Sequence, residues 1–240
     1  MPETEPGRAL ESTPEFTPPP ADPPSAVNED LALAQLADRD LNSKEIERTA
    51  RNTGLIKSRK VRLALVSHPH TPRRIALRLI RELYSFELMH FALLPTAAPD
   101  LKRLADELLI SRLASVTLGE RISLARRCSE RAAGALLLDK EARVWQAALE
   151  NPRLTEASVV RALQRGVTAP FVEAVCRHPK WSLRHEIRIA LLRNAHTPLA
   201  RALEFARRLP PAQLRDVLHS SKLPEKIKEY LRKDMRRASR

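Results

Sequence analysis

A phrase that recurs along the chain constrains its fold more than any other feature. The phrase joins the end of one helix, a turn with Asn or His, and a Pro or Glu that opens the next helix. Recurrence of one helix–turn–helix phrase is typical of stacked repeats, in which each unit buries its apolar face against its neighbours. The copies read ALVSHPHTPRRIAL at 64–77, FALLPTAAPDLKRL at 91–104, AALENPRLTEASVV at 147–160, ALLRNAHTPLARAL at 190–203 and VLHSSKLPEKIKEY at 217–230.

The turn residues of the phrase are suited to helix boundaries. Thr71 and Thr197 are predicted to be N-caps, because a threonine hydroxyl accepts a hydrogen bond from an amide of the first turn. Pro72 and Pro198 would then stand at the first helical position, where a missing N–H costs nothing. These turns should therefore be short and stiff.

The remaining sequence predicts helices throughout and no strands. Apolar residues recur at three- and four-residue steps, as Leu101, Leu104, Ala105 and Leu108 do, which is the pattern of one buried helix face. We expect an all-α chain that forms a right-handed α-solenoid of irregular repeats, with one irregular joint between 114 and 140. The helices are predicted at 30–40, 43–52, 58–67, 72–83, 85–93, 99–114, 118–133, 140–150, 156–165, 168–177, 182–193, 198–208, 211–219 and 224–237.

The N-terminal segment differs from the rest in composition. Residues 1–30 hold eight of the nineteen prolines and seven acidic side chains against one Arg. Such a segment is too polar to bury a core. We therefore expect three parts: a disordered acidic Pro-rich tail at 1–29, capping helices at 30–57 and the repeat domain at 58–237.

The net charge of the body is strongly positive. The whole chain has 42 basic and 29 acidic side chains, so residues 31–240 keep 41 basic and 22 acidic ones, a net +19. This excess attracts polyanions or an acidic partner, and the acidic tail could screen it. A competing interpretation is that the arginines serve only helix formation and solubility.

One candidate binding surface lies near 180–188. Arg184 and Arg188 stand one turn apart on the helix expected at 182–193, whose apolar stripe would include Leu183. They should project together, and Lys180 would extend the same positive patch. Trp181 precedes the expected cap Ser182, so packing on the first turn is its favoured role. The alternative is an exposed Trp that stacks on a base or a partner side chain.

A second candidate cluster consists of Arg126, Arg127 and Arg131. No catalytic, metal or cofactor site is predicted. His68 and His70 flank a turn without the third or fourth ligand that zinc requires. Cys128 and Cys176 show no pairing pattern and are expected to be buried in a cytoplasmic protein. No stretch has the roughly 18 apolar residues of a membrane span.

The phrases ENPRLTEASVVRAL and RNAHTPLARAL, with KWSLRHEIRIALLRN between them, resemble bacterial HEAT-like repeats and the related leucine-rich repeat variant. The resemblance covers about 58–235 and implies an irregular HEAT-like solenoid. It also implies a binding or scaffold role rather than an enzyme. Some leucine-rich repeat variant proteins carry an iron–sulphur centre on a cysteine cluster, which this chain lacks, so no cofactor is implied.

These observations leave two hypotheses about the function of the chain. The leading hypothesis is a non-catalytic interaction or scaffold module that binds a protein partner, through an acidic surface or peptide, on a basic helical-repeat surface. The alternative is a nucleic-acid-binding HEAT-like protein, in its enzymatic form similar to an alkylpurine DNA glycosylase. Glycosylases of that family read DNA with aromatic and acidic residues, whereas aromatic residues make up 4% of this chain. The enzymatic form is therefore the less favoured one.

Overall fold

Short amphipathic helices, each ended by turn residues, build the whole of the described chain. The computed structural model describes residues 25–238, and side chains for 28–237. The regular elements in this range are all α-helices apart from one 3-10 turn, which confirms the all-α prediction. The expected tail, residues 1–29, lies outside the described part except for its last residues, which belong to α1. The helices are α1 (Ser25–Ala37), α2 (Ser43–Arg51), α3 (Thr53–Lys57), α4 (Arg59–Ser67), α5 (Arg73–Ile80), α6 (Ser85–Leu93), α7 (Pro99–Arg112), η1 (Leu113–Ser115), α8 (Leu118–Arg127), α9 (Glu130–Leu136), α10 (Ala142–Leu149), α11 (Glu156–Gln164), α12 (Ala169–Arg177), α13 (His185–Arg193), α14 (Leu199–Ala206), α15 (Pro211–His219) and α16 (Glu225–Ala238).

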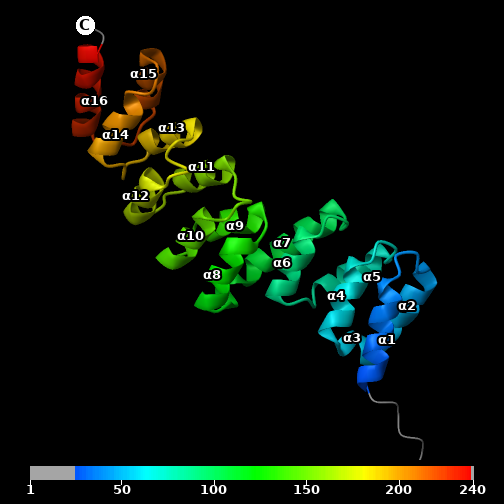
Figure 1. The fold of residues 1–240 in the computed structure, drawn as a ribbon. Helices are drawn as coiled ribbons and strands as arrows, with labels where there is room; N and C mark the ends of the chain where they lie inside the picture. The colour runs from blue at the N-terminus through cyan, green and yellow to red at the C-terminus, as the bar shows by residue number, and fades with distance from the viewer. Residues whose placement is uncertain (1–24, 239–240) are drawn as a thin grey trace, which may run out of the picture.

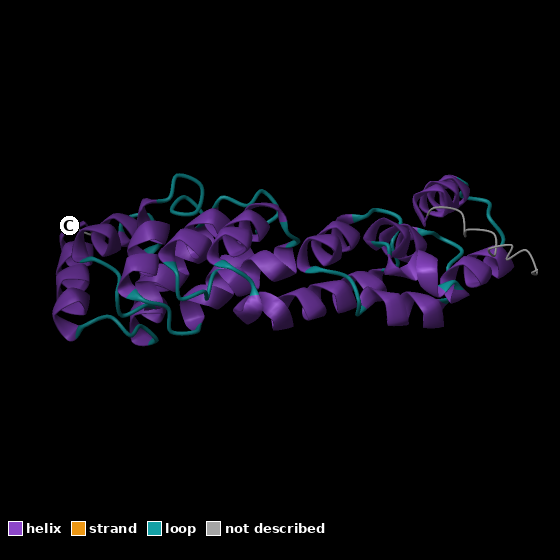
Figure 2. Cartoon of the chain, turned by 90° about the horizontal axis from the view of Figure 1, so that it is seen from below, coloured by secondary structure: helices purple, strands orange, loops and turns teal. Residues whose placement is uncertain are grey.

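The helices form two rows along an elongated body (Figures 1 and 2). One row places α4, α6, α8, α10 and α12 in succession, and the other places α5, α7, α9, α11, α13 and α15 in succession. Helix α1 packs on α4 at one end, and α14 packs on α16 at the other. The termini of the described chain therefore lie far apart, at opposite ends of the body (Figure 1).

The apolar core runs between the rows instead of gathering at one centre. Most helices contribute buried residues at three- and four-residue spacing, such as Ile75, Ala76, Leu79 and Ile80 on α5. Residues with this spacing share one face of a helix. The largest fully buried side chains are spread along the body and include Leu65, Leu79, Phe91, Leu109, Leu124, Phe171, Trp181 and Phe205.

A polar side chain directly after a helix fastens its turn to an earlier part of the stack. The Nδ2 of Asn151 donates to the carbonyl oxygens of Ala125 and Cys128, at 2.8 and 3.1 Å, while its Oδ1 accepts from the backbone N–H of Arg153. Asn194 makes the equivalent bonds to Leu163 O and the N–H of His196, both at 3.0 Å. We call this arrangement a turn clamp.

Three further turns use other side chains at the clamp position. His68 Nε2 lies 2.8 Å from Asp38 O, and its Nδ1 accepts from the N–H of His70. Ser221 Oγ donates to Leu192 O at 2.6 Å and accepts from the N–H of Leu223. His178 Nδ1 accepts from the N–H groups that follow it, and its Nε2 faces Glu150 at 3.2 Å. The clamp explains why the repeated phrase contains Asn or His.

The threonines of the phrase do not act as the predicted N-caps. Pro72 and Pro198 occupy the N-cap positions themselves and supply no side-chain bond. The hydroxyls of Thr71 and Thr197 instead donate backwards, to Leu65 O at 2.5 Å and Leu191 O at 2.6 Å. One residue before the cap, a hydroxyl reaches the last turn of the preceding helix, where carbonyl groups lack helical partners.

Several predicted helices have different boundaries in the structure, and two of these differences affect the candidate surface. The helix expected at 118–133 is broken between α8 and α9, because Ser129 turns outward and caps α9 by accepting from the N–H of Ala132 at 3.2 Å. The helix expected at 182–193 begins only at His185. Leu183 therefore lies in the preceding turn, with 63% of its surface exposed, and is not part of an apolar stripe.

The predicted irregular joint is also misplaced. Both rows pass through 114–140 with close packing, since α9 contacts α7, α8, α10 and α11, and α8 contacts α6 and α10. Local irregularity there is confined to the 3-10 turn η1 and the break after α8. Close packing lapses further along, between α12 and α14, which are not among the well-packed helix pairs.

Candidate binding surface

The turns that follow α8, α10 and α12 lie against one another at one edge of the stack. The Asn151 clamp joins the second turn to the first. Arg153 Nη1 adds a bond to Arg127 O at 3.2 Å. The indole N–H of Trp181 donates to Leu149 O at 2.9 Å and joins the third turn to the end of α10. These bonds fix the three turns relative to each other.

Exposed cationic side chains project from these turns and form what we call the basic edge. Its members are Arg126, Arg127, Arg153, Lys180 and Arg184. None of them forms an ion pair with a described residue, whereas many other arginines of the body do. The nearby acid Glu150 faces His178. The basic edge therefore offers positive charge that the protein itself leaves unneutralised.

Two of the predicted basic residues are engaged within the protein. Arg131 Nη2 lies 2.9 Å from a Glu107 carboxylate oxygen. Arg188 is half-buried and its Nε donates to Ser182 O at 2.8 Å, and burial together with the neighbouring Arg208 lowers its pKa. Arg184 and Arg188 do not share a helix as expected, because Arg184 is the N-cap of α13.

Trp181 is not part of an exposed surface. Only 1% of the residue is accessible, and the Lys180 Nζ lies 4.0 Å from the ring centroid. The indole is held by Leu149 O within the stack. Stacking of this ring on a base or a partner side chain is therefore ruled out, and the predicted surface loses its one aromatic residue.

Arg153 is the member of the basic edge that sequence reasoning missed. It stands two residues after the clamp Asn151, as Lys180 stands two residues after the clamp His178. Its backbone position is thus equivalent to that of Lys180. Alignment of the NPR and HPK turns would have revealed the pair.

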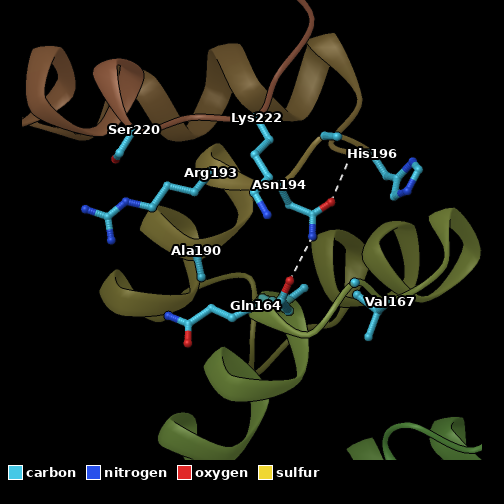
Figure 3. A pocket seen from close by; sticks show the side chains of 11 residues that line it. Gln164, Val167, Ala190, Arg193, Asn194, His196, Ser220 and Lys222 are labelled. Atoms are coloured by element: carbon cyan, nitrogen blue, oxygen red, sulfur yellow. Dashed lines mark hydrogen bonds between the residues drawn. The ribbon is translucent and has the colours of Figure 1, made fainter.

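A cavity of about 320 Å³ lies at the ends of α11 and α13, next to the turn after α15 (Figure 3). Asn194 occupies its centre, and the side chain of Lys222 extends towards it, whereas the guanidinium of Arg193 lies to one side. Leu163, Gln164, Gly166, Val167, Ala190, Ala195, His196 and Ser220 complete the lining. Gly166 permits the tight turn after α11, since its φ of 80° belongs to the left-handed region.

A neighbouring groove of about 530 Å³ lies between α9 and α11. Gly134 suits this close approach, because a Cβ there would lie 3.3 Å from Ser158 Oγ, a tight contact. Arginines line the groove, but Arg161 is bound to Glu130 at 3.2 Å. Thr155 also donates to Glu130, at 2.9 Å, as does Ser158. The carboxylate of Glu130 in this groove is therefore paired with Arg161 and hydrogen-bonded by two hydroxyl groups.

The cysteines lack the properties of nucleophiles. Cys128 and Cys176 are free and buried. Burial raises the pKa of each thiol to about 12, so both are protonated near neutral pH, and the thiolate is the reactive form. Within residues 28–237, no group of three or more His, Cys, Asp and Glu side chains could hold a metal ion.

A buried carboxyl group near the first turn makes stability depend on pH. Burial raises the pKa of Asp106, against the opposing bond from Ser129 Oγ at 2.6 Å; Arg131 lowers it, and Glu107 and Glu130 raise it. The ionised form is therefore destabilised in the folded state.

We expect Asp106→Asn to unfold at a higher urea concentration than wild type at pH 7. The advantage should shrink as the pH falls through the raised pKa, and vanish below the unfolded carboxyl pKa of about 3.9. Urea titrations at several pH values measure this difference. A variant less stable than wild type at pH 7 would contradict a penalty for the buried charge.

Comparison of the chain with family models, with curated proteins and with solved structures gave no match. Among the described residues, no helix has the length and apolar character needed to cross a bilayer. The basic edge and the cavity are therefore interpreted from their own geometry.

Proposed function

We propose that this chain is a non-catalytic interaction module that binds the acidic surface or acidic peptide of a protein partner on its basic edge. The proposal includes a right-handed α-solenoid of irregular HEAT-like repeats and a cytoplasmic location. Stacked repeats commonly use their extended surfaces for binding, which supports the non-catalytic role.

The observation that carries the proposal is the uncompensated charge of the basic edge. Five cationic side chains, from the end of α8 and the turns after α10 and α12, are exposed and have no carboxylate partner within residues 28–237. Side chains that donate to backbone carbonyl groups hold the three turns together without neutralising these cations. A surface whose backbone is fixed in advance loses less conformational entropy when an acidic partner binds.

Nucleic acid is the second candidate, because a row of arginines and lysines also suits phosphate groups. The burial of Trp181 favours the protein partner, since single-stranded nucleic acids are commonly held by exposed aromatic side chains. The two candidates differ in salt dependence. Binding to nucleic acid weakens steeply as salt rises, because condensed counterions are released. Binding to an acidic protein surface, whose charge density is lower, is screened by salt but weakens less steeply.

The test is capture of partners from native cytosol by the full chain, with and without nuclease. The edge variant combines Arg126→Glu, Arg153→Glu and Lys180→Glu. A matched control combines Arg48→Glu, Lys60→Glu and Arg215→Glu, which changes the net charge equally at exposed residues elsewhere. We expect a protein that binds the wild type and the control, withstands nuclease and is lost with the edge variant.

Capture that disappears with nuclease would favour the nucleic-acid candidate. Equal capture by the edge variant and the control would overturn both candidates, because the positive charge would then serve only solubility.

A further inference from the structure

The cavity of Figure 3 and the basic edge lie at opposite ends of the same two helices, α11 and α13. Helices α11 and α13 begin beside the basic edge, after Arg153 and Arg184, and the cavity lies at their C-terminal ends. Each helix has nine residues and so spans about 13 Å. A partner that follows the stack could therefore contact both places.

The cationic side chains at this cavity are not needed to cap the helix ends. Basic residues near a helix C-terminus often bind its last carbonyl groups, but neutral donors occupy those groups here. Asn194 Nδ2 binds Leu163 O, and the backbone N–H of Lys222 binds Arg193 O at 3.0 Å.

The two carbonyl groups before that of Arg193 also accept hydrogen bonds from neutral donors. Thr197 Oγ1 binds Leu191 O, and Ser221 Oγ binds Leu192 O, both at 2.6 Å. Arg193 and Lys222 are exposed, and their side chains have no acceptor among the described residues. Their charges are therefore free to bind an anion.

The lining of the cavity suits an acidic side chain. It contains no Asp or Glu, and it combines Arg193 and Lys222 with the amide of Gln164 and the methyl group of Ala190. Figure 3 shows Ala190 and Gln164 below the two cationic residues. The short aliphatic stem of an acidic residue can rest on the methyl group while its carboxylate meets the ammonium of Lys222, with the charge of Arg193 at the side of the cavity.

The helix ends favour a carboxylate over a phosphate. The C-termini of α11 and α13 border the cavity, and each carries a partial negative charge of about half an elementary charge. A singly charged anion is repelled less by these termini than a doubly charged one. The volume of about 320 Å³ is also at the lower end of ligand cavities, roughly 300–1,000 Å³.

We propose that this cavity binds the carboxylate of a Glu or Asp side chain in an extended acidic segment of the protein partner. The inference rests on the proposed function and gives the partner a second contact, one helix length from the basic edge. Lys222 binds the carboxylate, Arg193 adds attraction from the side of the cavity, and Ala190 supports the stem.

The test uses fluorescein-labelled octaglutamate and measures its anisotropy with the full chain. All proteins carry the edge variant, so that the basic edge does not contribute. The cavity variant adds Arg193→Gln and Lys222→Gln, and its matched control adds Arg215→Gln and Lys226→Gln, which lower the charge equally at exposed residues without partners. A swapped variant with Arg193→Lys and Lys222→Arg keeps the charge.

We expect the cavity variant to bind octaglutamate about tenfold more weakly than its matched control, because hydrogen bonds to a charged group are lost. The swapped variant should retain most of the binding. Equal affinity of the cavity variant and its control, or no binding to the parent protein, would overturn the inference. Neither result would affect the proposed function, which depends on partner capture by the basic edge.

Discussion

Asn151→Ala should lower the free energy of unfolding by about 3 kcal/mol, because the change strands several buried hydrogen-bonding groups at once. Asn151 is 1% exposed, donates to Ala125 O and Cys128 O and accepts from the N–H of Arg153. Urea denaturation measures the loss as a lower midpoint at an unchanged slope.

Gln146→Ala is the matched control for this change. Gln146 lies exposed on α10, the helix that precedes Asn151, and has no side-chain partner among the described residues. Its replacement should change stability by less than about 0.5 kcal/mol. If Asn151→Ala and Gln146→Ala both unfold at the same urea concentration as wild type, the Asn151 side chain does not hold the turn after α10 against the turn after α8.

Trp181→Ala should be still more destabilising, by about 4 kcal/mol, because the truncation leaves a large cavity in the stack. The residue is 1% exposed, and its indole N–H binds Leu149 O at 2.9 Å. Calorimetric melting of the full chain measures the loss. Trp181→Phe retains a packed ring but not the hydrogen bond, so its melting temperature should fall between those of wild type and Trp181→Ala. An alanine variant as stable as wild type would show that the ring is not buried.

The helices could be predicted from the sequence because their signals are local. Apolar residues at three- and four-residue steps placed α6 at 85–93 and α15 at 211–219, as the structure has them. The break at Ser129 was missed because α8 and α9 have similar composition, and a Ser can end one helix and cap the next. Leu183 was assigned to a helix face because its residue type fits one, although the turn leaves it exposed.

The role of the clamp residues could not be predicted from their immediate neighbours. Asn151 and Asn194 bind carbonyl groups 23–31 residues earlier in the chain, and the stacking of the repeats decides which carbonyl lies within reach. The backward bond of Thr197 likewise depends on how the turn folds onto the preceding helix.

The candidate surface was predicted in part. Arg126, Arg127, Lys180 and Arg184 were identified as two separate clusters. In the structure Arg153 bonds to Arg127 O, and Trp181 bonds the third turn to the end of α10. Their union depends on the packing of α8, α10 and α12, which a linear sequence does not display. The burial of Trp181 has the same origin, because its partner Leu149 lies on another helix.

The affinity of the Arg153→Glu variant for the captured partner tests the central claim most directly. Arg153 lies between the two clusters, so a partner that contacts the whole basic edge must approach it. Arg143→Glu is the matched control, since Arg143 is exposed on the adjacent α10 and has no partner among the described residues. We predict about tenfold weaker binding for Arg153→Glu, or roughly 1.4 kcal/mol, with the control near wild type. Equal affinities of the two variants would contradict the account of a single binding surface across the three turns.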